Sequence, residues 1–201
     1  MYRFIIGIAL AAFSMNVLAQ GDAAHGKTLT VVCQACHGPE GNSTAGTFPK
    51  LAGQNPDYLV KQMHNIKSGN RQVPAMTGML NGLSDQDMED IAAYYGAQTI
   101  TPGAAKPDLV KEGEAIYRAG IMRKHVAACS SCHMPDGKGN NSARFPALAG
   151  QWPEYVEAQL KAFRDGTRHN DGSGKMMRTT AMDLSDKEIT AVSSYIYGLR
   201  K

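Results

Sequence analysis

The stretch FPKLAGQNPDYLVKQMHNIKSGNR, at residues 48–71, occurs a second time as FPALAGQWPEYVEAQLKAFRDGTR at residues 145–168. Eleven of the 24 positions are identical, and the comparison needs no gap. Further on, LSDQDMEDIAAYY (83–95) matches LSDKEITAVSSYI (184–196). A repeat of this kind predicts two homologous domains, joined by the Pro-, Gly- and Ala-rich segment that follows the first. We place the first domain at 20–100, the linker at 101–107 and the second domain at 108–201.

Each half is predicted to be a small all-α domain. In the first repeat, Asn55 is expected to cap a helix that has Pro56 in its first turn. Leu59, Met63 and Ile66 then fall on one apolar face. The second repeat keeps this spacing at three positions, Val156, Leu160 and Phe163.

The last helix of each half is expected to begin at a capping motif. Ser185 and Glu188 form a capping box, and Ser84 and Asp87 form a close variant of it. No convincing strand pattern of alternating apolar and polar residues is present. Domains of about 90 residues with long Gly- and Pro-containing loops have little apolar core of their own, so we expect another group to fill the centre of each half.

The N-terminus has the layout of a secretory signal peptide. Arg3 precedes an apolar run from Phe4 to Val17, and small residues follow, so cleavage is expected after Ala19. The run has 14 residues, fewer than the roughly 20 that cross a bilayer; the alternative is an uncleaved membrane anchor. No other long apolar stretch is present, so residues 1–19 are assigned as a signal peptide and the mature protein is expected to be a soluble protein of the periplasm.

Charge is divided unevenly between the halves. Residues 20–100 carry five Lys and Arg against seven Asp and Glu, a net of −2, whereas residues 101–201 carry fifteen against eleven, a net of +4. No long basic run is present, so nucleic acid is not expected as a partner. The asymmetry is suited to orienting the molecule towards a charged partner; an ordinary solvated surface is the alternative.

Two short motifs, CQACH at 33–37 and CSSCH at 129–133, stand near the start of the two halves. CxxCH is the attachment sequence for c-type haem. Two cysteines three positions apart can reach two neighbouring vinyl groups of one porphyrin, and the histidine that follows lies under the ring, where Nε2 can ligate iron. The residues are Cys33, Cys36 and His37 for one haem and Cys129, Cys132 and His133 for the other.

Three other uses of four cysteines are less consistent with this pattern. Two disulfides are common in exported proteins, but these cysteines are clustered rather than spread through the chain. A thioredoxin-like redox pair needs neither the histidine nor a second copy. A zinc site would have to combine two CxxC pairs that belong to separate, complete repeats.

The doubled CxxCH and FPxLAGQ motifs, the methionine before LSD and the amphipathic last helix resemble the dihaem cytochrome c-4 family, built from two class I cytochrome c domains. The resemblance covers nearly the whole mature chain. It implies two covalently bound haem c groups in domains related by a pseudo-twofold axis. It also implies a monomeric electron carrier, not an enzyme, and peripheral contact with the membrane surface is compatible with the sequence.

The partners implied by the resemblance are redox proteins: a membrane-bound quinol-oxidising complex as donor and a haem-copper terminal oxidase as acceptor. Two alternatives remain. A dihaem peroxidase-like enzyme would need one iron with an open position, whereas both halves offer a methionine at matching places. A cytochrome subunit of a larger redox complex is compatible with the sequence.

Methionine is the common sixth ligand of c-type cytochromes. Met63 and Met88 are predicted core residues, which leaves five candidates: Met76, Met79, Met176, Met177 and Met182. Counting back from the two LSD motifs pairs Met76 with Met177, whereas counting forward from the two arginines that end the repeat pairs Met79 with Met176. The first register places the four extra residues of the second half in a Gly-rich loop, and the family pattern favours it. We therefore choose Met76 and Met177, with Met79 and Met176 as the alternatives.

The resemblance also implies the groups around each ligating histidine. In class I cytochromes c the Nδ1–H of this histidine is donated to a proline carbonyl in a Pro-x-Leu segment, which orients the ring. The matching residues are Pro49 with Leu51 and Pro146 with Leu148. The alternative is that the prolines only shape a loop.

The resemblance further implies that the haem propionates meet at an interface between the halves, which the short linker and the opposite net charges favour. Lys50 and Arg144 stand beside the two FPxL segments and are expected to help neutralise propionates. The histidines without a partner in the other repeat are predicted to be surface or local structural residues: His25, His64, His125 and His169.

Overall fold

The structure is a computed structural model that describes residues 21–200. The predicted signal peptide and its cleavage site lie outside the described residues. Within them every regular element is a helix, and the only strand-like pairing is two isolated bridges, Ile121–Val126 and Asn140–Phe145. The prediction of an all-α fold is confirmed.

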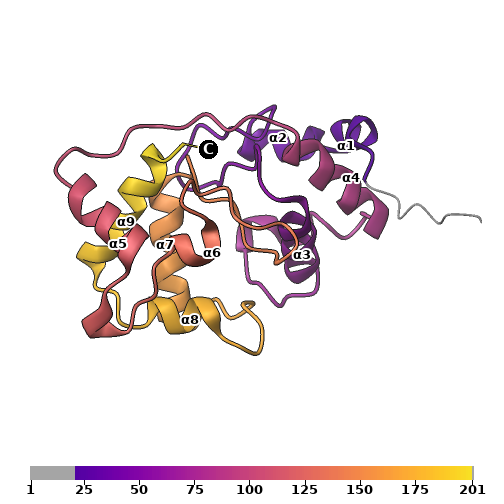
Figure 1. Cartoon of the computed structure of the whole chain (residues 1–201). Helices are drawn as coiled ribbons and strands as arrows, with labels where there is room; N and C mark the ends of the chain where they lie inside the picture. Colours follow the sequence, from indigo (N-terminus) through magenta and orange to yellow (C-terminus); the bar gives the residue numbers. More distant parts are fainter. Residues whose placement is uncertain (1–20, 201) are drawn as a thin grey trace, which may run out of the picture.

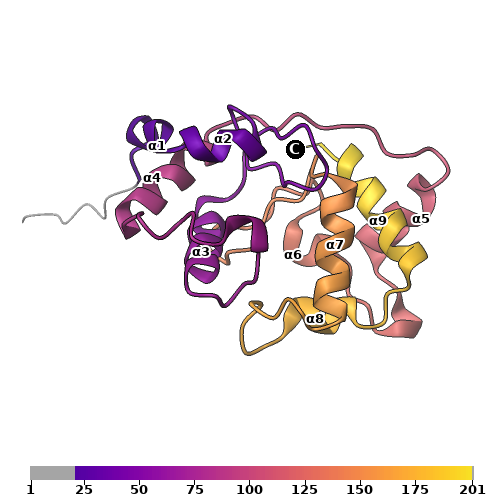
Figure 2. The same ribbon diagram turned by 180° about the vertical axis from the view of Figure 1, so that it is seen from behind.

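The two halves contain corresponding helices and lie side by side (Figures 1 and 2). The first half consists of α1 (Ala23–Leu29), α2 (Val31–His37), α3 (Pro56–Lys67), the 3₁₀ turn η1 (Pro74–Met76) and α4 (Asp85–Gly96). The second half consists of α5 (Val110–Ala119), η2 (Met122–Lys124), α6 (Ser130–His133), α7 (Pro153–Arg164), α8 (Met176–Ala181) and α9 (Asp186–Gly198).

In each half the first and last helices pack tightly because a glycine lies at their contact. A Cβ on Gly26 of α1 would lie 2.0 Å from the carbonyl oxygen of Asp90 in α4. A Cβ on Gly113 of α5 would lie 2.3 Å from the carbonyl oxygen of Ala191 in α9. No side chain fits at either position, so glycine permits these helix crossings.

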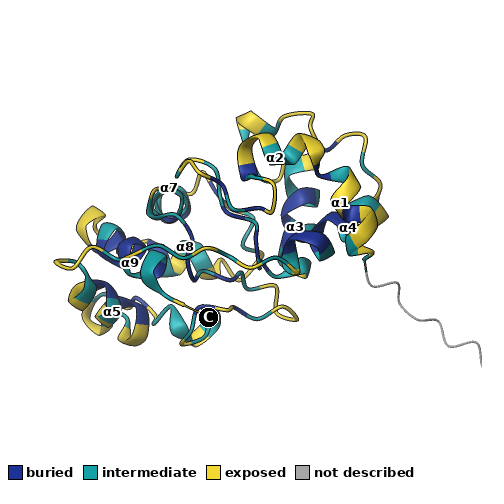
Figure 3. Cartoon of the chain, turned by 90° about the horizontal axis from the view of Figure 1, so that it is seen from above, coloured by how far each residue is buried: buried dark blue, intermediate teal, exposed yellow. Residues whose placement is uncertain are grey.

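Each half has its own apolar core, formed along the predicted helical faces (Figure 3). Met63 and Met88, predicted as core residues, are 9% and 0% exposed. In the second half, Val156 and Phe163 are buried on α7, and Ile189 and Ile196 are buried on α9. The core is therefore built from the amphipathic helices of the repeat.

The predicted helix starts are correct, with one exception in detail. Both final helices begin with a complete capping box, Ser84 with Asp87 and Ser185 with Glu188. Asn55 does precede α3, but its side chain makes no capping bond. The expected cap was wrong because the Asn55 Nδ2 donates instead to backbone carbonyls of the other half, including that of residue 145 at 2.7 Å.

The connection between α4 and α5, residues 97–109, is attached to both halves (Figure 1). The Thr101 amide donates to Asn42 of the first half at 2.8 Å. The Gly103 amide donates to the Tyr197 carbonyl of the second half at 3.1 Å, and a Cβ on Gly103 would overlap the Tyr197 ring. These bonds hold the connection at defined points on both domains.

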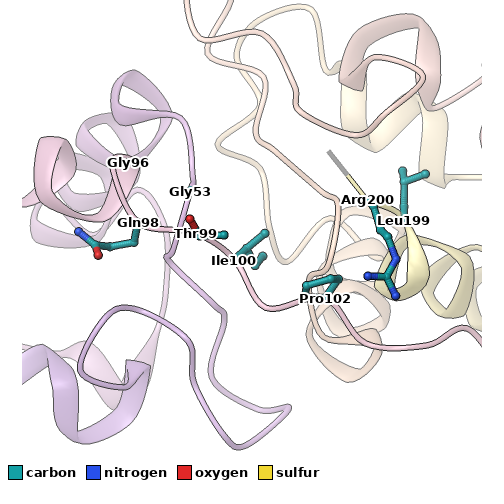
Figure 4. Close-up of a pocket in the computed structure, with 8 residues that line it drawn as sticks. All are labelled: Gly53, Gly96, Gln98, Thr99, Ile100, Pro102, Leu199 and Arg200. Atoms are coloured by element: carbon teal, nitrogen blue, oxygen red, sulfur yellow. The ribbon is translucent and has the colours of Figure 1, made fainter.

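The same connection lines a pocket between the halves. Figure 4 shows Ile100 and Pro102 there, with Gly53 on the side of the first half and Leu199 and Arg200 on the side of the second.

Among residues 21–200, no helix is both long enough and apolar enough to cross a bilayer.

Candidate functional site

Both CxxCH motifs lie on short helices that end at the histidine. Cys33 and Cys36 are one turn apart on α2, and α6 begins directly after Cys129. Residues three apart lie on the same face of a helix, so the two sulfurs of each motif can face one porphyrin. The chain then turns away at Gly38, with a φ of 80°. Its counterpart Met134 has a φ of 67° and a ψ of 156°, a region that residues other than glycine rarely adopt.

Each of the two histidines is buried and oriented by a proline carbonyl. The Nδ1 of His37 lies 2.8 Å from the carbonyl oxygen of Pro49, and the Nδ1 of His133 lies 2.9 Å from that of Pro146. Burial lowers the pKa of both imidazoles, so they are neutral near pH 7. A neutral ring that donates from Nδ1 has its lone pair on Nε2, which is the arrangement of a haem-ligating histidine.

The leucines of the Pro-x-Leu segments pack against the two cores, and the phenylalanine before each segment lies near the histidine. Leu51 lies against the core of the first half and Leu148 against that of the second. The ring of Phe48 lies 6.3 Å from that of His37, and the ring of Phe145 lies 6.2 Å from that of His133. Each imidazole therefore has an aromatic ring as a neighbour.

The cysteines do not have the properties of the alternative sites. Burial raises the pKa of Cys33, and it raises the pKa of Cys129 to about 11, whereas a redox-active thiol has a lowered pKa. All four thiols are free. Within residues 21–200, no three His, Cys, Asp or Glu side chains are grouped as around a metal ion, so the two CxxC pairs do not form a joint zinc site.

The methionines differ in exposure. Met76 ends η1, is half-buried and packs against the core of the first half. Met177, in α8, is also half-buried. Met79 and Met176 are 45% and 48% exposed, and Met182 is 59% exposed. The less exposed methionines are thus those of the register counted back from LSD.

The loop before Met177 is fixed by a buried carboxylate. Asp171, which lies within the extra residues of the second half, accepts hydrogen bonds from the Arg178 amide at 2.9 Å and from its Nε at 2.8 Å. The side chain of Asp171 is 3% exposed. The first half has no counterpart at this position of the repeat, so this attachment is specific to the second methionine.

Two arginines to which the sequence analysis gave no role beyond marking the register meet between the halves. Arg71 and Arg168 are the last identical residues of the 24-residue repeated stretch. Both donate to Gln62 and Gln159, at 2.8–3.2 Å. Each also donates to a tyrosine of the opposite half, Arg71 to Tyr155 at 2.9 Å and Arg168 to Tyr58 at 3.0 Å. Within residues 21–200, neither arginine forms an ion pair with a carboxylate. Burying two cations without an anion is unfavourable, so this cluster is suited to carboxylates that the protein itself does not supply.

Lys50 and Arg144, which were expected near the propionates, lie in different surroundings. The Lys50 side chain is 4% exposed, donates to the Thr101 carbonyl and lies 4.5 Å above the Trp152 ring. Arg144 is exposed. The cations gathered between the halves near neutral acceptors are instead Arg71 and Arg168, and their identity in both repeats was the available signal.

The four histidines that have no counterpart in the other repeat are local structural or surface residues. The Nδ1 of His25 lies 2.6 Å from a carboxylate oxygen of buried Asp90, which links α1 to α4. His64 lies 3.9 Å from Asp85. His125 and His169 are exposed.

Free thiols paired on a helix, neutral buried imidazoles and a pair of guanidiniums between the halves form a consistent donor set. These groups are of the kinds that hold the vinyl edges, the iron and the propionates of haem. The residues present therefore fit two haem c groups.

Comparison with known proteins agrees with this assignment. The family model for cytochrome c matches residues 23–95 and again residues 110–200. Cytochrome c4 of Pseudomonas aeruginosa is 54% identical over 181 residues, which cover 90% of both chains. The crystal structure of reduced recombinant cytochrome c4 from Pseudomonas stutzeri superposes with a TM-score of 0.88 at 50% identity, covering 90% of this chain and 100% of that one.

A more distant relative is named for its electron donor. The thiosulfate dehydrogenase electron acceptor of Stutzerimonas stutzeri is 36% identical over 192 residues, which cover 93% of this chain and 86% of the relative. The duplicated family match, the high identity and the superposition of both halves point to one group of proteins: the chain belongs to the dihaem cytochrome c4 family, whose members carry two covalently bound haem c groups.

Proposed function

We propose that this protein carries electrons in the periplasm, from a membrane-bound quinol-oxidising complex towards a haem-copper terminal oxidase. The observation that carries the proposal is the repetition of one ligand set: each half has a buried histidine and a half-buried methionine. Haem c supplies a reversible one-electron change between ferric and ferrous iron. Two equivalent, fully ligated sites suit electron carriage, because neither leaves a position open for a substrate.

We infer that the axial ligands are His37 with Met76 and His133 with Met177. The proline carbonyls orient the imidazoles, which keeps the ligands in place during electron transfer. Methionine ligation and burial of the site favour the ferrous state and a high reduction potential. Covalent attachment through Cys33, Cys36, Cys129 and Cys132 prevents loss of the cofactor from an exported protein.

Two measurements test this proposal. Intact-mass analysis of the mature protein is expected to show two haem additions and cleavage after Ala19. Cys33→Ala or Cys129→Ala is expected to remove one haem, from its own half only. A mature chain without two haem additions would contradict the assignment.

Carbon monoxide binding tests the axial ligands. Met76→Ala and Met177→Ala are each expected to open one ferrous iron to carbon monoxide and lower one reduction potential, because the thioether favours the ferrous state. The matched controls are Met79→Ala and Met176→Ala, which are expected to leave both properties unchanged. Ready binding to one iron of the unsubstituted protein would favour the peroxidase-like alternative.

The relative named as the electron acceptor of thiosulfate dehydrogenase favours a dehydrogenase as a second candidate donor. Mixing the oxidised protein with each purified donor and following haem reduction distinguishes the two. Purification as a monomer without detergent would separate a free carrier from a fixed subunit of a complex.

A further inference from the structure

Two glutamines connect the halves through reciprocal amide contacts. Gln151 donates from Nε2 to the Lys50 carbonyl and accepts at Oε1 from the Lys50 amide, both at 2.9 Å. Gln54 makes the same pair of bonds to the carbonyl and amide of Ala147, at 2.9 and 2.7 Å. Both glutamines are buried, with 7% exposure for Gln54 and 5% for Gln151. The side-chain amides thus bind backbone in the opposite half, in matching positions of the repeat.

The residues they bind follow directly after the prolines that orient the histidines. The Pro49 carbonyl and the Lys50 amide belong to one peptide group, so His37 and Gln151 bind its two ends. In the other direction, the peptide group after Pro146 connects His133 with Gln54. Each chain of hydrogen bonds starts at a histidine in one half and ends at a glutamine in the other.

We propose that Gln151 is a positioning residue for the haem of the first half and Gln54 for the haem of the second, each acting through the opposite half's proline carbonyl. This inference rests on the proposed function, since it requires the two histidines to be haem ligands. It goes beyond it by stating that each half tunes the iron of its neighbour. The consequence is a polar connection from each redox site to a side chain of the opposite half.

The direction of the effect follows from peptide resonance. A hydrogen bond accepted from the peptide N–H increases the electron density on the carbonyl oxygen of the same group. Linked hydrogen bonds strengthen one another by about 10–30% per bond. A stronger carbonyl acceptor draws the Nδ1 proton of the histidine, which raises donation from Nε2 and stabilises ferric iron. Loss of the glutamine is therefore expected to raise the reduction potential of the haem in the other half.

Direct charge contacts do not provide this connection. Every ion pair found among residues 21–200 lies within one half. The predicted attraction between the net charges of −2 and +4 is therefore not accompanied by an ion pair between the halves in this part of the chain. Neutral amides make the closest contacts to the peptide groups beside the histidines.

The test is a crossed pair of substitutions in the holoprotein, Gln151→Met and Gln54→Met. Methionine has a similar length but replaces the amide with a thioether. The matched control is Asn141→Ala, because Asn141 accepts a hydrogen bond from the Asp57 amide across the same interface at 3.0 Å but lies outside both chains. Intact mass first verifies two haems in every variant. Optical redox titration, with NMR assignment of each haem, then gives both potentials, and NMR of the reduced protein follows the Nδ1 protons.

We expect a crossed result. Gln151→Met raises the potential of the haem on Cys33 and Cys36 more than the other, and shifts the Nδ1 proton of His37 upfield. Gln54→Met does the same to the haem and histidine of the second half. Asn141→Ala moves neither. If Gln151→Met does not accumulate with two haems, Gln151→Asn keeps the amide but shortens its reach and is expected to produce the same crossed shift.

Three results would overturn the inference. A shift confined to the half that carries the substitution, equal shifts of both haems, or unchanged potentials in the glutamine variants would each show that the glutamines only fasten the halves together. These results leave the proposed function intact. An unsubstituted protein without two haems would instead refute the proposed function before the crossed comparison is made.

Discussion

The closest helix contact of the first half provides a sharp test of how it is packed. In Gly26→Ala the new Cβ would lie 2.0 Å from the Asp90 carbonyl oxygen, whereas real Cβ contacts are essentially never shorter than 3.0 Å. Helices α1 and α4 must therefore separate by about 1 Å, and neither side of the contact is a flexible side chain. Overpacking of this kind lowers the free energy of unfolding by about 1–3 kcal/mol. The new Cβ meets backbone, which cannot move aside as a side chain can, so we expect a loss near the upper end of this range.

The intrinsic preference of alanine for helices offsets about 1 kcal/mol of that, which leaves a net loss of about 2 kcal/mol. Guanidinium denaturation of the holoprotein measures the total loss, and hydrogen exchange shows whether it lies in α1 and α4. Amides there are expected to exchange about 30-fold faster. Gly82→Ala is the control, because Gly82 has an ordinary φ and nothing within 4 Å of its added Cβ. Equal stability of the two variants would refute this account of the helix contact.

Three further perturbations address single contacts. Asp171→Asn is expected to loosen the loop that carries Met177, so carbon monoxide should bind one ferrous haem several times faster; an unchanged rate would show that the ion pair does not support the methionine. A hydrogen bond to Asp90 raises the pKa of His25, and the same bond lowers the pKa of Asp90. The stabilisation is therefore complete below pH 6.5 while Asp90 stays ionised, and it is lost as the pH rises through the raised pKa of His25. In His25→Gln the denaturation midpoint is expected to fall less steeply as the pH rises through the pKa of His25. An unchanged slope would contradict the link between protonation of His25 and stability. Met134→Gly is expected to stabilise the second half by about 1 kcal/mol by relieving a left-handed backbone, as thermal unfolding would show; a lower melting temperature would mean that the side chain is needed.

Local signals in the sequence were sufficient for the helices and the haem motifs. A capping box uses residues three apart, and CxxCH places its ligands within five consecutive residues, so neither depends on the rest of the fold. The role of Gly26 could not be predicted in this way. A glycine within a helix signals a close approach only when the helix that crosses it is known.

The contacts between the halves also could not be predicted from local sequence. Gln54 and Arg71 are identical to Gln151 and Arg168 in the repeat, which marks them as positions where the polar group matters. Their partners in the opposite half could not be read from that identity, because these partners are about 100 residues away in sequence. The side chain of Asn55 was assigned to the nearest backbone for the same reason, although it binds a more distant one.

The reciprocal glutamine contacts make the interface isologous in the sense used for symmetric dimers. Each half contains both the glutamine and the backbone segment that a glutamine binds: Gln54 with Lys50, and Gln151 with Ala147. A half that is produced alone is therefore self-complementary, and two copies can form all four of the glutamine–backbone hydrogen bonds found in the natural chain. Sedimentation of the isolated first half should detect a homodimer. The covalent connection at residues 97–109 then acts mainly by raising the effective concentration of one half near the other, and it selects the mixed pair over two identical ones.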